Sequence, residues 1–231
     1  YVLDQNLKPA GAVENLAPTE RIYSVRFLGK RAYVVTFKQT DPLIALDLSD
    51  PRQPRVTGEL KIPGFSNYLH PYGENFLIGF GKDAEADGQY AKTKGLKLSL
   101  FDVSDPAAPK ELDTYLMGDM GSDSAALYDH KAFLFSAEKN LLVVPASLRR
   151  STAANSWGDI YFNGAMVLRI ENNKFVLNGK IAHESKLVET IKPASVESIM
   201  PIWDGGHYYD PAVKRSVYIG DNLYTFSDRL L

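Results

Sequence analysis

One turn-forming stretch occurs twice in this chain, and the repeat constrains the fold more than any other feature. Residues 44–54 read IALDLSDPRQP, and residues 99–109, 55 positions later, read SLFDVSDPAAP. Each copy is a run of strand-forming residues followed by the same Ser-Asp-Pro turn. A self-similar unit of this kind, built from strands and turns, is typical of stacked four-stranded sheets. The repeat therefore predicts an all-β architecture built from blades.

Strand signals recur along the whole chain and allow the blades to be delimited. Short β-branched or aromatic runs alternate with Gly, Asn, Asp and Pro, and no segment sustains the 3.6-residue apolar period of a helix. Within each blade the strands are called A to D in chain order. The first blade is predicted at 23–27, 32–37, 42–48 and 55–61, and the second at 67–72, 75–81, 96–103 and 110–117.

The remaining strands predict a third full blade and two partial ones. The third has strands at 125–128, 132–135 extending into 141–144, 164–170 and 175–181, and the fourth has strands A, B and C at 206–209, 216–219 and 223–226. The first residues fit strands C and D of a preceding blade. We therefore expect a β-propeller of four-stranded antiparallel blades, with about three full blades and two partial ones, as a single domain over residues 1–231. We expect these blades to be part of a larger propeller, and an unusually small closed ring is the alternative.

The long connections of this pattern share one edge of the blades. In antiparallel blades the connections after strands B and D emerge on the same side. Two B-to-C connections, Lys82 to Lys94 and Pro145 to Asn163, and two D-to-A connections, Gly118 to Ser124 and His183 to Met200, are the long insertions. Binding residues gather on such loops when a rigid scaffold holds them. This face is therefore the expected binding face.

Three stretches carry a family resemblance that covers essentially the whole chain. They read ERIYSVRF at 20–27, LKLSLFDVSD at 96–105 and YDHKAFLF at 128–135. In these stretches the chain resembles secreted proteins of bacteria and archaea with a C-terminal β-propeller domain distantly related to WD40 repeats. The resemblance implies a propeller fold, an extracellular or cell-envelope location, and correspondence to the C-terminal part of a longer propeller. No Trp-Asp pair closes a blade as in WD40 repeats, because Trp203-Asp204 falls in a predicted loop.

Composition excludes several classes of protein. The 26 Lys and Arg residues nearly balance the 28 Asp and Glu residues, so the chain lacks the basic face that nucleic acid requires. No apolar stretch is long enough to span a membrane. The absence of cysteine excludes disulfides, thiolate catalysis and Cys-ligated zinc.

The acidic run at 83–88 is the strongest local signal for a ligand. Asp83, Glu85 and Asp87 alternate before Gly88, as in the opening of a calcium loop. The match is partial, because Lys94 stands where an EF-hand places its bidentate Glu. The sequence leaves two interpretations open: a calcium site held by these three carboxylates, or a solvated acidic loop.

Catalytic motifs are missing from the sequence. The repeated Asp47/Asp50 and Asp102/Asp105 pairs fit turn chemistry, since a catalytic pair is needed once and a turn is needed in each blade. The four histidines form no i, i+4 ligand pair, and neither a Gly-x-Ser-x-Gly elbow nor a phosphate-binding Gly motif occurs. No catalytic or cofactor-binding residue is assigned.

Aromatic residues in the long connections predict a binding surface. Tyr90, Trp157, Tyr161 and Trp203 lie in or beside these connections, and His207 follows on the same face. They either grip a peptide or a sugar ring or fold back on their own loops. We expect a non-enzymatic propeller that binds a protein or glycan partner at the cell envelope. The alternative is a hydrolase or lyase that uses carboxylates and a histidine, with or without calcium.

Overall fold

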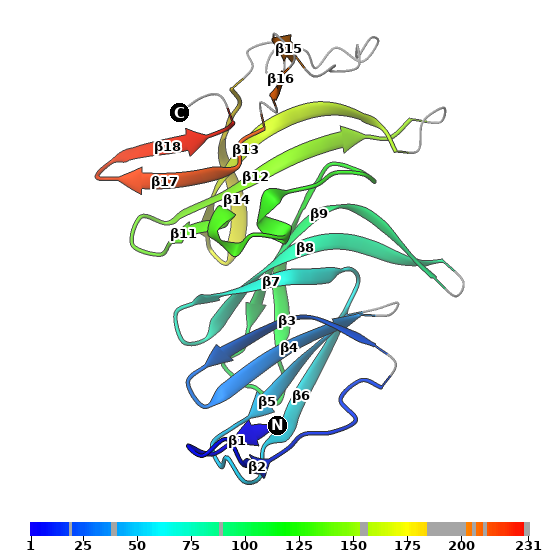
Figure 1. Cartoon of the computed structure of the whole chain (residues 1–231), viewed down its shortest axis with the longest axis vertical. Coiled ribbons are helices and arrows are strands. Elements are labelled where there is room, and N and C mark those ends of the chain that lie inside the picture. Colours follow the sequence, from blue (N-terminus) through cyan, green and yellow to red (C-terminus); the bar gives the residue numbers. More distant parts are fainter. Residues whose placement is uncertain are drawn as a thin grey trace. The chain divides into compact units, whose positions relative to one another are not determined.

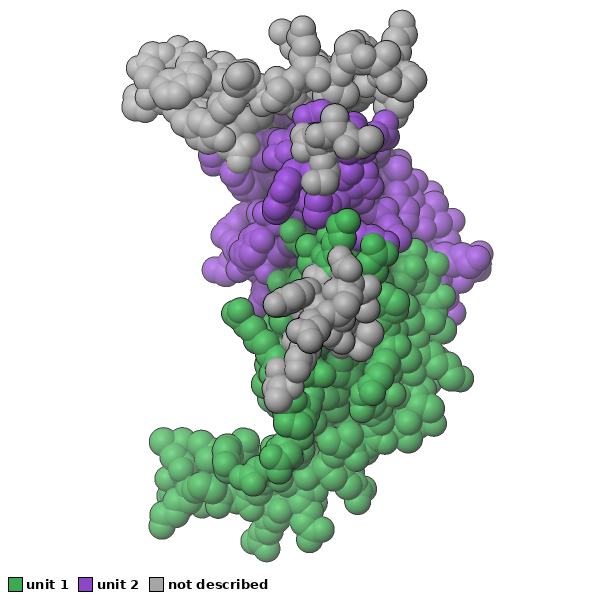
Figure 2. Space-filling view, turned by 90° about the vertical axis from the view of Figure 1, so that its right-hand side faces the viewer, with its two compact units in different colours: residues 1–93, 97–114 green, residues 94–96, 115–231 purple. Residues whose placement is uncertain are grey.

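The structure is a computed structural model of the 231-residue chain. It describes residues 1–18, 20–37, 41–87, 90–152, 157–183, 202–204, 207–209 and 212–228. Only the backbone is described at residues 37, 41, 86–87, 90–91, 202–204 and 207–209. The chain divides into two compact units (Figure 2): unit 1 comprises residues 1–93 and 97–114, and unit 2 comprises residues 94–96 and 115–231.

Among the described residues, strands form three four-stranded sheets, each in simple meander order (Figure 1). Blade 1 comprises β3 (Arg21–Leu28), β4 (Arg31–Phe37), β5 (Asp41–Asp47) and β6 (Arg55–Ile62). Blade 2 comprises β7 (Phe65–Tyr72), β8 (Phe76–Asp87), β9 (Tyr90–Asp102) and β10 (Lys110–Met117). Blade 3 comprises β11 (Leu134–Ser136), β12 (Leu141–Arg150), β13 (Asp159–Glu171) and β14 (Lys174–Ile181).

Shorter elements complete the described chain. Three two-stranded antiparallel sheets pair β1 (Val2–Leu3) with β2 (Pro9–Gly11), β15 (Ile202–Asp204) with β16 (His207–Tyr209), and β17 (Arg215–Ile219) with β18 (Asn222–Phe226). Two 3-10 helices are η1 (Ala125–Leu127) and η2 (His130–Ala132). No helix in the described part of the chain is long and apolar enough to cross a membrane. The predicted all-β fold, with three full and two partial blades, is confirmed.

Both faces of the central strands of blade 1 are buried, which explains their almost continuous apolar sequence. On one face Tyr33 and Leu43 pack with Leu69 and Phe101 of blade 2. The other face carries a second cluster, formed by Ala32, Val34, Ile44 and Leu46, against which residues 13–17 pack. Burial of this kind is the main force that stacks the sheets of unit 1.

The repeated Ser-Asp-Pro turns are structural, as predicted. Asp47 and Asp50 each accept a 2.9 Å hydrogen bond from the backbone N–H two positions ahead. Asp102 and Asp105 make the same two bonds. The hydrogen bond from the Ser49 side chain is the main cause that lowers the pKa of Asp47. All four carboxylates thus serve as hydrogen-bond acceptors in the turns between strands C and D.

Each Ser-Asp-Pro turn lies against a glycine of the preceding D strand. A Cβ added at Gly11 would meet the carbonyl oxygen of Pro51 at 2.4 Å. At Gly58 it would meet the carbonyl oxygen of Pro106 at the same distance. Real Cβ atoms do not approach oxygen so closely, so only glycine permits this contact. We call such a glycine a turn seat.

The first strand of blade 3 differs from the prediction. Residues 125–128 were expected to be strand A, but residues 125–127 form η1 with Tyr128 as its C-cap, and η2 follows at 130–132. The side chains of Ser124 and Asp129 cap these helices by accepting the N–H groups of Ala126 and Lys131. Such capping competes with strand formation. Strand A is the short β11, and strand B is β12.

The strands predicted for the fourth blade are also paired differently. The segment expected at 206–209 as strand A includes β16, which pairs with β15. The segments expected as B and C, 216–219 and 223–226, pair with each other as β17 and β18. Trp203-Asp204, predicted to lie in a loop, lies in β15.

Two of the predicted loops are largely strands. Within 82–94, β8 continues to Asp87 and β9 starts at Tyr90. Ala84 is buried and Glu85 is exposed, which is the alternation of a strand. Within 145–163, β12 continues to Arg150, which pairs with Asp159 of β13. Extended hairpins thus replace the loop prediction for most of both segments. Of the predicted connection 183–200, residues 184–200 lie outside the described residues.

Candidate functional site

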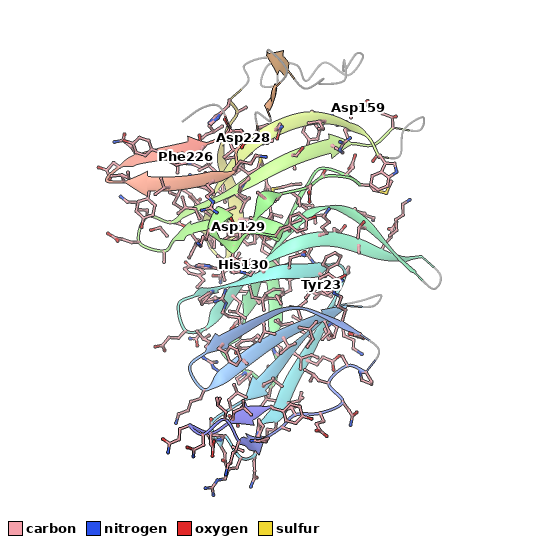
Figure 3. All side chains as sticks on the ribbon, viewed as in Figure 1. Tyr23, Asp129, His130, Asp159, Phe226 and Asp228 are labelled. Atoms are coloured by element: carbon pink, nitrogen blue, oxygen red, sulfur yellow. The ribbon has the colours of Figure 1, made fainter. Side chains whose placement is uncertain are left out.

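The far end of the β12–β13 hairpin in unit 2 carries two of the predicted binding residues. Asp159, labelled in Figure 3, opens β13 at this end. Leu148 pairs with Phe162 and Arg149 pairs with Ile160, which leaves Tyr161 as the extra residue of a β-bulge. Bulges re-aim a side chain and are common beside functional sites.

Tyr161 is held beneath a guanidinium group. The Cζ atom of Arg150 lies 4.9 Å from the centroid of the Tyr161 ring, a cation–π contact. Burial is the main cause that raises the pKa of the Tyr161 phenol, and the charge of Asp119 adds to it, while the nearby Arg150 lowers the pKa. Tyr161 is thus a neutral phenol that can donate a hydrogen bond at neutral pH.

Trp157 lies at the same end of the hairpin and is 66% exposed. Its ring rests on Gly121, where an added Cβ would be 3.3 Å from a ring carbon. Arg149 Nη1 donates to the carbonyl oxygen of Gly158 at 2.9 Å, which anchors the backbone next to the indole. One side of the exposed ring therefore packs against the Gly121 backbone.

The connection at 118–124 fastens this end of the hairpin. Asp119 N–H donates to the Arg149 carbonyl at 2.8 Å, and the Asp119 carboxylate accepts from Ser151 N–H at 2.8 Å. Ser122 Oγ accepts from Arg149 N–H at 2.9 Å. Asp123 and Ser147 exchange two backbone bonds. This predicted loop is irregular in structure but bonded along the edge of β12.

We call Arg150, Trp157 and Tyr161, which share this end of the β12–β13 hairpin, the Trp157 patch. An exposed indole can stack on the apolar face of a sugar or on an aliphatic side chain. A phenol supplies a hydrogen-bond donor, and a guanidinium group supplies a cation for a carboxylate or sulfate. The patch thus combines the groups needed to bind a polar partner that has an apolar face.

Sequence reasoning named Trp157 and Tyr161 as candidates but did not name the neighbouring Arg149 and Arg150. Arg149 and Arg150 close a strand, where charged residues are ordinary. A signal for these arginines was present in the sequence, because Arg149 and Arg150 are adjacent and precede a segment rich in aromatic residues.

The three predicted calcium ligands lie in β8 and not in a loop. Alternate residues of a strand point to the same side, so the backbone allows Asp83, Glu85 and Asp87 to share a face. The side chain of Asp87 is not described. Among the side chains that are described, no three His, Cys, Asp or Glu residues gather closely enough to hold a metal ion. The calcium site stays a prediction.

The other predicted binding residues have described backbones only. Tyr90 is the first residue of β9. Trp203 pairs with Tyr208, and Asp204 pairs with His207, across the β15–β16 hairpin. Their side chains lie outside the described residues, so a role for Tyr90, Trp203 and His207 in binding stays a prediction.

A second polar group, in unit 1, joins strands β3 and β7. Tyr68 and His70 share a 2.9 Å hydrogen bond through the phenol and Nδ1, and Arg26 lies over the Tyr68 ring. Burial, with a smaller effect of the Arg26 charge, lowers the pKa of His70 to about 4. Arg26 Nε also donates to the Leu69 carbonyl at 2.6 Å. This group links two blades through neutral His70.

A pocket of 370 Å³ in unit 1 is lined by several acidic residues. Glu20 accepts a 2.6 Å bond from Thr36, and Glu59 pairs with Lys61 at 3.5 Å. These carboxylates are already engaged, so the pocket is a weaker candidate site than the Trp157 patch.

Repeated four-stranded antiparallel sheets, stacked through their faces and turns, define a β-propeller architecture. Comparison with known families agrees: the family described as "Beta propeller domain" matches residues 1–231, so the chain belongs to this family.

Two curated relatives are archaeal. An uncharacterized protein of Methanocaldococcus jannaschii is 38% identical over 227 residues, which cover 98% of this chain and 28% of the relative. An uncharacterized protein of Archaeoglobus fulgidus is 44% identical over 146 residues, 63% of this chain and 22% of the relative. The chain thus spans about a quarter of the length of these relatives.

A solved structure of a Saccharomyces cerevisiae Dbp5 complex with Nup159 and Gle1 contains a chain that matches 69% of this one. The match covers 47% of that chain at 9% identity with a TM-score of 0.23, so the similarity is remote.

Proposed function

We propose that this protein is a non-enzymatic binding or scaffolding propeller whose protein or glycan partner contacts the Trp157 patch. The observation that carries the proposal is the exposure of a supported indole. Trp157 is 66% exposed, although its ring rests on Gly121 and the adjacent backbone is anchored by Arg149. A large aromatic ring with few rotatable bonds loses little conformational entropy when a partner covers it.

The proposal also includes the location of the protein and its place within a larger propeller. The likeness to secreted proteins with a C-terminal propeller related to WD40 repeats supports an extracellular or cell-envelope location and a place within a larger propeller. The relatives, roughly three times as long as this chain, are compatible with such a propeller.

The test is a binding screen with matched variants. Arrays of glycans and of peptides are probed with the wild type, Trp157→Ala and Tyr161→Ala. Losing a central aromatic contact of about 2 kcal/mol weakens binding about thirtyfold. Phe27→Ala is the control, because Phe27 in unit 1 is 68% exposed, close to the exposure of Trp157. Ligands bound equally by the wild type and both patch variants would exclude the patch as the binding site.

We also propose that Asp83, Glu85 and Asp87 bind calcium. Alternation along β8 supports a shared face for the three carboxylates. Excess calcium should raise the midpoint of thermal unfolding of the wild type, because a ligand that binds only the native state stabilises it. Chelator and the Asp87→Ala variant should each abolish the rise. Equal midpoints with calcium and chelator would remove calcium from the account.

A further inference from the structure

The β17–β18 hairpin has the features of the first half of a blade. Gly220 at its turn has a φ of 59°, and Gly29 and Gly73, at the A-to-B turns of blades 1 and 2, have φ values of 60° and 65°. In unit 2, β17 contacts β11 and β12 of blade 3, just as in unit 1 β7 contacts β3 and β4 of blade 1. The β17–β18 turn also lies on the same side as the β11–β12 turn (Figure 1). β17 and β18 are thus strands A and B.

This hairpin is bound firmly to blade 3. Leu223 packs with Val143, Val167 and other residues of the blade 3 core. Arg215 pairs with Asp129, and the ring nitrogens of His183 bond Thr225 and Ser227 at 2.8 and 2.9 Å. Figure 3 labels Phe226 and Asp228, which end this segment. No further strand of the described chain pairs with the free edge of β18.

The turn seats indicate which kind of C-to-D turn packs against each D strand. Gly11 and Gly58 each lie against a long Ser-Asp-Pro turn of the next blade. Blade 3 instead has a tight C-to-D turn at Asn172 and Asn173, both with positive φ, and the preceding D strand carries Asp113 at the position of the seat. A seat glycine thus accompanies a long turn.

Gly179 is the seat glycine of blade 3, and within the described part of the chain no turn covers it. No described atom lies within 4 Å of the Cβ that an alanine would have there. Leu177, two residues earlier on β14, is 38% exposed although it is apolar. The free edge of β18 and the open seat at Gly179 thus occur together, where strands C and D of a fourth blade would pack.

We propose that the free edge of β18 and Gly179 form a docking site for a strand hairpin whose turn carries the Asp-x-Ser-Asp-Pro sequence. The occupant is a C–D hairpin of a further repeat within a longer protein, and the length of the relatives leaves room for one. The hairpin of this chain's own β1 and β2 fits less well, because its turn, Asp4 to Lys8, lacks the Asp-Pro pair.

The site is tested with chain fusions that place a hairpin after Asp228. The first fusion adds a copy of residues 38–62, which brings the β5–β6 hairpin and its long turn. Amide exchange across 222–226 should become about tenfold slower or more, because β18 gains a paired edge. The midpoint of thermal unfolding should rise with it. Unchanged exchange at β18 would overturn the proposal.

Gly179→Leu tests whether the gain in stability requires contact at the turn seat or only pairing with β18. It should cancel the gain in the first fusion but leave the unfused chain unchanged. A control fusion adds a copy of residues 163–181, whose tight Asn172–Asn173 turn needs no seat, and its gain should survive Gly179→Leu. If Gly179→Leu lowers the midpoint of the unfused chain, the seat is not open and the proposal fails. If protection of β18 in the unfused chain rises with protein concentration, the occupant is a second copy, which refutes a further repeat of the longer protein.

Discussion

Gly58→Ala should destabilise the protein by crowding the contact between blade 1 and the turn of blade 2. The added Cβ would lie 2.4 Å from the carbonyl oxygen of Pro106 and 2.7 Å from that of Ala107. Both atoms belong to a backbone held by the hydrogen bond that Asp105 accepts from Ala107 N–H. The turn must therefore move as a whole to relieve the contact.

The expected size follows from two opposing effects. Overpacking costs about 1 to 3 kcal/mol. Replacing glycine by alanine recovers about 0.4 to 1 kcal/mol, because the unfolded chain loses freedom. The difference between these ranges is a net destabilisation of about 0 to 2.6 kcal/mol, and a clash with backbone atoms favours the upper half of this range. In a chain of this size each kcal/mol lowers the unfolding midpoint by about 2 to 4 °C.

Gly179→Ala is the matched control, since it changes the equivalent position where no described atom is within reach. Thermal unfolding followed by circular dichroism compares both variants with the wild type. Gly58→Ala should unfold at a lower temperature, and Gly179→Ala at the wild-type temperature or slightly above it. Equal midpoints for the two variants would refute the turn-seat reasoning.

Three further predictions concern single residues. The pKa of His70 is lowered to about 4 in the folded state, so the neutral ring contributes its full stability to the fold above about pH 6.5. This contribution is lost as the pH falls toward 4. His70→Gln should therefore remove about 1 to 2 kcal/mol from the pH dependence of the unfolding free energy in acid titrations. Lys97→Ala leaves Glu111, 3.0 Å away, without its buried cation and should cost about 3 kcal/mol in denaturant unfolding. Gly73→Ala should cost about 1 to 2 kcal/mol thermally, and Gly73→Asn much less, because asparagine tolerates a φ of 65°.

Much of the blade structure follows from local sequence. Strands β5, β6 and β10 lie within one residue of their predicted bounds, because alternation, Gly turns and Asp-Pro turns act over a few residues. The extensions of β8 and β9 were missed because charged residues such as Lys82 and Glu85 resemble a loop. Helices η1 and η2 were missed because the capping roles of Ser124 and Asp129 depend on backbone geometry.

The order of strands in the fourth blade required tertiary contacts. Residues 206–209 resemble a strand as strongly as 216–219 do, so the sequence alone favoured the wrong first strand. Gly220 was the local clue, since its place matches Gly29 and Gly73. At the Trp157 patch the aromatic residues were predicted, but the bulge that places Tyr161 beneath Arg150 arises from the register of β12 and β13.

The claim that the Trp157 patch binds the partner is tested most directly by the fluorescence of Trp157 itself. The chain has two tryptophans, so Trp203→Phe leaves Trp157 as the only indole. This variant is titrated with a glycan or peptide identified on the arrays, and calorimetry measures the affinity independently. We predict a saturable shift of the emission to shorter wavelength with the calorimetric affinity, because the ligand covers the exposed ring. Calorimetric binding without any change in Trp157 emission would contradict the claim.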